Sequence, residues 1–125
     1  MLLYIDFNEE TPIYQQIRNQ IILAIANGEL SSGEKLPPIR NLADEAGVNM
    51  MTVSKAYQML KVEGYIFTDR RSGAIVTERD KREKKMSEKA CESLKILAAE
   101  AVLSGMAKQD FLEACDKLYT EAIGK

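Results

Sequence analysis

The sequence predicts a mainly α-helical chain with one small β-hairpin. Apolar side chains recur at the three- and four-residue spacing of a buried helix face in five separate segments. Two of these segments are separated by only three residues, Gly47 to Asn49. Two short runs rich in β-branched and aromatic residues, on either side of a polar turn at 69–73, predict the hairpin.

The segment between residues 49 and 64 is predicted to be a helix with one buried face. Asn49 can cap its start and Gly64 can end it. The opposite face carries hydrogen-bonding and basic side chains, which gather toward its N-terminal half. The residues expected on the buried face are Val53, Ala56, Tyr57 and Leu60.

A second amphipathic helix is predicted immediately before it, from Ile39 to Ala46. Gly47 ends this helix, because glycine takes up a left-handed conformation that other residues resist. Two helices joined by a short turn with a glycine are typical of a helix-turn-helix, whose second helix enters the DNA major groove. The alternative is an ordinary corner between two helices with a solvated polar face.

The hairpin that follows favours DNA binding. Its predicted strands are residues 65–68 and 74–77. Arg70 and Arg71 lie at its tip, where a wing would meet the sugar–phosphate backbone or the minor groove. Two helices followed by an arginine-tipped hairpin form a winged helix-turn-helix, which we predict for residues 1–78.

Ten residues are predicted to contact DNA. They lie at the start of the helix before the turn, on the exposed face of the helix after it, and at the tip of the hairpin. Their polar and basic side chains can reach base edges or phosphates. The predicted set is Arg40, Asn49, Met50, Met51, Thr52, Ser54, Lys55, Arg70, Arg71 and Gly73.

Three elements are predicted ahead of the helix-turn-helix. Residues 3–7 alternate over too short a run to stand alone, so we expect an edge strand or a strap over a neighbouring element. Thr11 and Pro12 are predicted to cap and open the first helix. Residues 30–38 are expected to form a loop that leads to the next helix.

Residues 79–125 differ in composition and are predicted to form a short two-helix C-terminal dimerisation tail. The charged run at 79–86 is interpreted as a solvated lead-in. Two helices can cover one stripe of each other, and the apolar arc left uncovered indicates an interface. We expect a homodimer; the alternative is that the tail folds back onto the first helix. The predicted dimerisation residues are Leu94, Leu97, Ala101, Phe111, Leu112, Cys115, Leu118, Tyr119 and Ile123.

Composition argues against a catalytic or metal site. The 125 residues include no histidine and only two cysteines, Cys91 and Cys115, so no zinc set is expected. Both thiols are predicted to be buried structural groups rather than a redox switch. Without histidine the usual general base is missing, and no glycine-rich phosphate loop is present, so we expect no enzyme activity and no cofactor.

The net charge of −2 is less basic than that of many DNA-binding domains. From Leu36 to Arg79, however, six basic residues outnumber five acidic ones. A local basic patch can attract DNA even though the total charge does not reveal it. No apolar run reaches the length of a membrane span and the N-terminus lacks signal-peptide features, so we expect a cytoplasmic protein.

Several short motifs occur together between residues 36 and 73. They are Leu36-Pro37-Pro38-Ile39-Arg40-Asn41-Leu42-Ala43, Gly47-Val48-Asn49, Thr52-Val53, Lys55-Ala56-Tyr57 and Glu63-Gly64-Tyr65-Ile66, with Leu60 and Gly73. Together they resemble the DNA-binding domain of the GntR family of bacterial transcription regulators, over residues 11–77. Ile5-Asp6-Phe7, the segment 12–17 and the short two-helix tail are similar to the YtrA-like subfamily.

The resemblance implies a sequence-specific transcriptional regulator, a repressor, that binds an inverted-repeat operator as a homodimer. It implies that Arg40 and residues 49–55 contact the operator and that Gly73 lets the wing approach the minor groove. Two departures concern the DNA contacts: Pro38 replaces a serine that touches a phosphate, and Arg71 replaces the first glycine of the wing tip. The signal expected to relieve binding is either a small-molecule effector at the dimer interface or a partner, and the residues do not choose between the two.

A third departure concerns residues that an alternative function would also use. Met50 and Met51 stand where the family commonly has polar or basic residues, which implies apolar contacts with DNA, for instance with thymine methyl groups. With Met59 they could form an adaptable apolar surface, because methionine side chains adjust readily to a partner. The alternative is therefore a winged-helix protein-interaction module that does not bind DNA.

Overall fold

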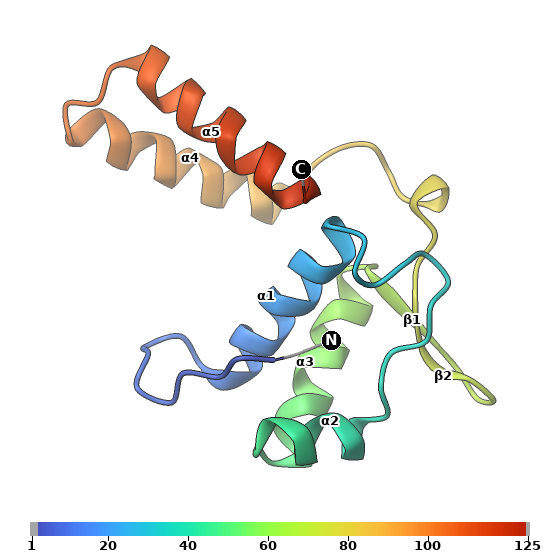
Figure 1. Ribbon diagram of the computed structural model, residues 1–125. Helices are drawn as coiled ribbons and strands as arrows, with labels where there is room; N and C mark the ends of the chain where they lie inside the picture. The colour runs from blue at the N-terminus through green and yellow to red at the C-terminus, as the bar shows by residue number, and fades with distance from the viewer. Residues whose placement is uncertain (1–2, 125) are drawn as a thin grey trace. The chain divides into compact units, whose positions relative to one another are not determined.

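The computed structural model describes residues 3–124 and divides into two compact units, Met1–Arg82 and Glu83–Lys125. The fold class is as predicted, mainly α-helical with one antiparallel hairpin (Figure 1). The first unit contains α1 (Ile13–Ala26), α2 (Ile39–Ala46), α3 (Met50–Val62), β1 (Ile66–Asp69), β2 (Gly73–Val76) and a short 3-10 helix (Arg79–Lys81). The second contains α4 (Glu88–Leu103) and α5 (Lys108–Ile123).

The core of the first unit lies where α1, α2 and the hairpin meet α3. Every residue predicted for the buried face of α3 is buried, and Leu60 and Val53 are fully enclosed. The hairpin adds one inward residue from each strand, Ile66 and Val76, which are paired in register. The core cluster comprises Ile17, Ile21, Ala24, Leu30, Leu36, Leu42, Ala43, Val53, Ala56, Tyr57, Leu60, Ile66 and Val76.

The turn between α2 and α3 has the predicted conformation. Gly47 adopts a left-handed φ of 68°, and the Val48 N–H donates to the Ala43 carbonyl at 3.0 Å, which closes the end of α2. Asn49 caps α3, since its side-chain oxygen accepts from the Met51 N–H at 2.7 Å. The two helices are therefore locked together over three residues.

The N-terminal segment is a strap and not an edge strand. Two glutamines of α1, one turn apart, bond to its backbone: Gln20 accepts from the Tyr4 N–H at 2.8 Å and Gln16 accepts from the Asp6 N–H at 2.9 Å. Gln16 is buried and also donates to the carbonyls of Asp6 and Thr11. The predicted cap by Thr11 is wrong, because Pro12 takes the cap position and the threonine hydroxyl turns away from the helix.

Residues 33–36 were predicted to be part of a loop, but they run along the outer edge of β2 and pair with it. The Leu36 N–H donates to the Ala74 carbonyl at 2.8 Å, and the Val76 N–H donates to the Glu34 carbonyl at 2.9 Å. Lys35 lies opposite Ile75 in this pairing. The segment therefore fixes the wing against the body of the unit.

The charged run after the hairpin is partly docked, which corrects its interpretation as a solvated lead-in. Arg79 donates to the Ile25 and Ala26 carbonyls, at 3.1 and 3.2 Å, where the C-terminus of α1 favours a cation. Arg82 donates to the Gly64 carbonyl at 2.9 Å, and its guanidinium lies 3.9 Å from the centre of the Tyr65 ring. These contacts place the end of the first unit at Arg82.

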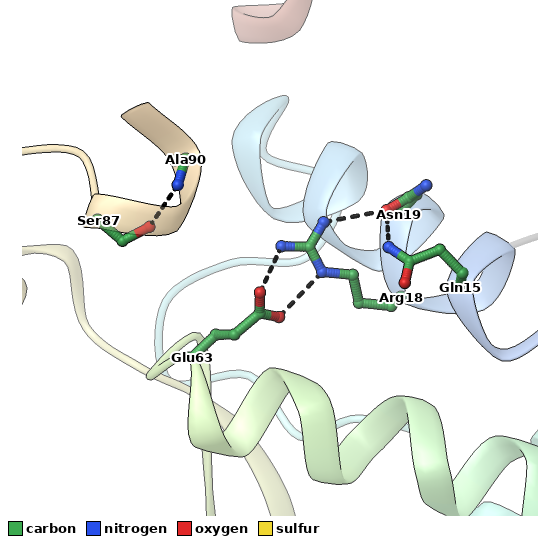
Figure 2. Close-up of polar contacts among 6 residues, drawn as sticks. All are labelled: Gln15, Arg18, Asn19, Glu63, Ser87 and Ala90. Atoms are coloured by element: carbon green, nitrogen blue, oxygen red, sulfur yellow. Dashed lines mark hydrogen bonds and ion pairs between the residues drawn. The ribbon is translucent and has the colours of Figure 1, made fainter. Parts of the chain in front are cut away.

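A two-pronged ion pair ties α1 to the end of α3. Arg18 on α1 bonds both carboxylate oxygens of Glu63, at 2.9 and 2.8 Å (Figure 2). Both side chains are about three-quarters shielded from solvent, and paired bonds of this kind fix orientation as well as distance. The contact holds the end of α3 in a set direction relative to α1.

Within the second unit, α4 and α5 run antiparallel and are joined by a turn in which Gly105 has a φ of 79° (Figure 1). Ser87 caps α4, because its hydroxyl accepts from the Ala90 N–H at 3.1 Å (Figure 2). Among the described residues of these two helices, none is buried.

Tyr57 links the core to the segment before α2 and offers a test of the packing. Its hydroxyl donates to the Pro37 carbonyl at 2.7 Å, and burial raises the pKa of the Tyr57 hydroxyl. Tyr57→Phe should cost about 1 kcal/mol and lower the melting temperature by roughly 4–8 °C, as measured by circular dichroism at neutral pH.

The same substitution should change the response to alkali. The pKa of the Tyr57 hydroxyl is higher in the folded than in the unfolded protein. The contribution of this hydroxyl to the free energy of unfolding is therefore complete below about pH 10 and is lost as the pH rises further. The difference in stability between the wild type and Tyr57→Phe should therefore narrow above pH 10. Parallel pH profiles for the two proteins would contradict this.

Candidate nucleic-acid interface

The ten residues predicted to contact DNA all lie in the first unit and outside its core. Nine are exposed and Thr52 is half-buried. The face of α3 that is predicted to contact DNA is therefore on the surface, because the apolar residues on the other side of the helix are buried in the core. Their position on the surface follows from the sequence; their contact with DNA remains a prediction.

The start of α3 has no acidic residue in its first turn. The N-terminal end of the helix dipole carries partial positive charge, which attracts anions such as phosphates. Asn49 uses its side-chain oxygen for the cap, so this oxygen is already engaged within the protein. The side chain is a positioning group for α3, and its amide N–H₂ points to no partner among the described residues.

Lys55 is held in place by a residue that the predicted site did not include. Its ammonium nitrogen lies 3.9 Å from the centre of the Tyr14 ring on α1, a distance at which the ring face attracts a cation. Tyr14 is half-buried. Its place beside the apolar stripe of α1 was visible in the sequence, but the pairing with a residue 41 positions later was not.

The tip of the wing is short and well defined. Asp69 and Gly73 are paired across the hairpin, so Arg70, Arg71 and Ser72 form the connection. The Asp69 carboxylate accepts from the Arg71 N–H at 2.9 Å, and Gly73 has a φ of 79°, which a residue with a Cβ would resist. Within residues 3–124, neither arginine side chain of the tip forms an ion pair.

The predicted dimerisation residues lie on the second unit and are exposed or half-buried. Tyr119 and Leu118 are 74% and 63% exposed, and Leu94, Leu97, Leu112 and Ile123 are also exposed. Ala101, Phe111 and Cys115 are half-buried. Large exposed apolar patches are typical of interaction sites, and dimerisation through these residues stays a prediction.

The expectation of two buried cysteines is wrong for this chain. Cys91 is exposed and Cys115 is half-buried, and both are free thiols. Their neighbours in sequence are apolar, but α4 and α5 together have too few layers to enclose them. Over the part of the chain that the structure describes, no cluster of three potential metal ligands occurs, and no helix has the length and apolar character needed to span a membrane.

Residues 13–76 match the model of the family described as bacterial regulatory proteins, gntR family. The HTH-type transcriptional repressor YtrA of Bacillus subtilis (strain 168) is 41% identical over 80 residues, 64% of this chain and 62% of that protein. The chain thus spans less than two thirds of that relative. The uncharacterized HTH-type transcriptional regulator YhcF of the same strain is 30% identical over 116 residues, 92% of this chain and 95% of that protein.

Several solved structures are similar to this chain. A transcriptional antiterminator from Listeria monocytogenes EGD-e has a TM-score of 0.85 at 29% identity, covering 100% of this chain and 95% of its own. YtrA from Sulfolobus acidocaldarius, a GntR-family transcription factor, has a TM-score of 0.64 at 40% identity, covering 81% and 99%. AraR(DBD) in complex with operator ORX1 has a TM-score of 0.54 at 25% identity, covering 62% and 95%.

The family match extends over α1, the helix-turn-helix and the wing, and so includes every element that carries a predicted DNA contact. The motifs quoted from the sequence lie within it. The chain therefore belongs to the GntR family of bacterial regulatory proteins, and within that family it is similar to YtrA.

Proposed function

We propose that the protein is a transcriptional repressor that binds an inverted-repeat operator as a homodimer. The observation that carries this proposal is the exposed polar face of α3 beside an arginine-tipped wing, both fixed to one rigid core. The AraR(DBD) structure, which holds operator DNA, supports the same use of this fold. In the proposed complex α3 enters the major groove and the wing enters the adjacent minor groove.

The first two turns of α3 would contact the base edges directly. Thr52 and Lys55 can bond to base edges or to phosphates, and Met50 and Met51 offer apolar contacts that suit thymine methyl groups. Met51 is 79% exposed although it is apolar, which favours a partner on this surface. Lys55, held against Tyr14, presents its charge from a restricted set of positions.

Attraction to the backbone falls to arginine. Arg40 lies in the first turn of α2 and is exposed, and Arg70 and Arg71 are carried at the tip of the wing. These side chains would position the protein on duplex DNA without reading its sequence. Because release of counterions drives such contacts, binding should depend strongly on salt.

The second unit supports the homodimer. A unit this small, with no buried residue in either helix, cannot be held by its own core and needs a partner surface. The apolar faces of α4 and α5 supply such a surface. A second copy of the chain is the partner that covers these faces in both copies at once. A small molecule bound where the tails meet would change the spacing of the two α3 helices and so relieve repression.

The competing function is binding of a protein partner by the exposed methionines of α3. Met50 is 46% exposed and lies beside Met51, and such an exposed pair of methionines favours protein binding. Such a module has no need of Arg40, Arg70 and Arg71 on the same side. If substitution of these arginines leaves partner binding intact while DNA binding is absent, the competing function is correct.

Selection of DNA from a random pool tests the main proposal. The captured fragments should share an inverted repeat with half-site centres about one helical turn, roughly 34 Å, apart. If each protomer neutralises about four phosphates, a plot of log affinity against log salt should have a slope near −7. Arg40→Ala should bind more weakly with an unchanged melting temperature, and Lys95→Ala, on α4, should bind normally. Absence of enrichment or of salt dependence would contradict the proposal.

Two substitutions at Asn49 separate its structural role from its place at the DNA face. Asn49→Ala removes the cap and should cost about 1 kcal/mol. Asn49→Asp keeps a capping oxygen and should melt at the wild-type temperature, yet it brings a negative charge toward the phosphates and should weaken DNA binding by about tenfold or more. Thermal unfolding and fluorescence anisotropy measure the two effects. Wild-type affinity for Asn49→Asp would remove Asn49 from the interface.

Disruption of the apolar face of α5 tests the homodimer. Leu118→Asp would place a charge in the proposed interface, so it should convert a dimer into a monomer, as measured by sedimentation equilibrium. Lys117→Asp, on the neighbouring position of the same helix, is the matched control and should remain a dimer. A monomeric wild-type protein would favour the alternative in which the tail packs against α1 of its own chain.

A further inference from the structure

A groove of about 420 Å³ lies between α3 and the wing. One wall is a single face of α3, formed by residues at i, i+3, i+4 and i+7: Ser54, Tyr57, Gln58 and Lys61. The opposite wall is the hairpin, from Thr68 and residues 71–74, and the segment 35–39 completes the lining. Ser54, Arg71 and Gly73 belong to the predicted DNA contacts, so the groove is continuous with that surface.

The charged residues that line the groove are all basic. Lys35, Lys61 and Arg71 line it, and no aspartate or glutamate does, although acidic residues outnumber basic ones in the whole chain. Within residues 3–124 none of these three side chains has an ion-pair partner. Apolar groups of Pro37, Pro38 and Tyr57 lie among them. The lining therefore matches a chain of anions joined by apolar units.

Duplex DNA presents such a chain at this place. The major groove and the adjacent minor groove of one duplex are separated by a single sugar–phosphate strand. If α3 occupies one and the wing occupies the other, that strand has to cross the space between them. We propose that the groove holds this strand and that Lys35 and Lys61 contact its phosphates, an inference that rests on the proposed function.

Lysine suits this role. Its ammonium group is a compact charge on a flexible stem, so it can follow a backbone whose phosphates repeat without regard to sequence. Lys61 lies in the last turn of α3, where a cation is also favoured by the helix dipole. A purely structural role would therefore change stability when Lys61 is replaced, whereas a phosphate contact would change the salt dependence of DNA binding.

The double variant Lys35→Gln/Lys61→Gln tests the inference on the selected operator. Each lysine that contacts one phosphate in each protomer of a dimer should contribute about 1.8 to the slope of log affinity against log salt, so the slope should become shallower by that amount for each. Affinity should fall at least about tenfold, equally for strong and weak operator sequences. The matched control Lys95→Gln/Lys108→Gln removes the same charge from exposed positions on the second unit and should leave the slope unchanged.

A change on the DNA side locates the contact. Neutral methylphosphonate linkages in the strand between the two grooves should weaken binding of the wild-type protein. The same linkages should weaken the double variant much less, because its contacts there are already lost. An equal loss for both proteins would overturn the assignment.

The remaining outcomes separate the failure of this inference from that of the function. An unchanged salt slope for the double variant, together with weak binding by Arg40→Ala, would overturn the groove assignment and leave DNA binding intact. A wild-type protein that binds no DNA would remove the proposed function itself. If pyrophosphate alone shifts the amide resonances of Gly73 and Ala74 while the double variant retains its DNA slope, the groove takes small anions instead, and the proposal is wrong.

Discussion

Burial of the inner face of α3 is the constraint on which the rest of the molecule depends. Val53, Ala56, Tyr57 and Leu60 close the core from the centre, and α1, α2 and the hairpin are each packed around them. Since a helix has only one such face, the choice of these four residues fixes which side chains point outward. The direction of Thr52, Ser54 and Lys55 is therefore a consequence of apolar packing rather than of any interaction made by those residues themselves.

Local patterns in the sequence were sufficient for the helix-turn-helix and the wing. The conformations of Gly47 and Asn49 depend on their neighbours only, and both were predicted from residue type and position. The two runs of β-branched and aromatic residues on either side of a polar turn were sufficient to predict the strands of the hairpin. The inner face of α3 was likewise predicted, because a three- and four-residue period of apolar residues has one efficient way to be buried.

Features that join distant segments could not be predicted in this way. The pairing of residues 33–36 with β2 relies on backbone groups, and neither Glu34 nor Lys35 has the side chain of a typical strand residue. The contact between Lys55 and Tyr14 requires the packing of α3 on α1 to be known first. For Cys91 and Cys115, apolar neighbours suggested burial, but burial also needs a further layer of structure, which two helices alone do not supply.

Docking of Arg79 and Arg82 determines where the first unit ends. Because Arg82 is fixed on Tyr65 and α4 begins at Glu88, only residues 83–87 lie between this contact and α4, and they contain no helix or strand. A fully extended tether of this length reaches at most about 18 Å, at roughly 3.6 Å per residue. This connection is short, so in any assembly built through α4 and α5 each copy would carry its winged helix on a tether of only five residues.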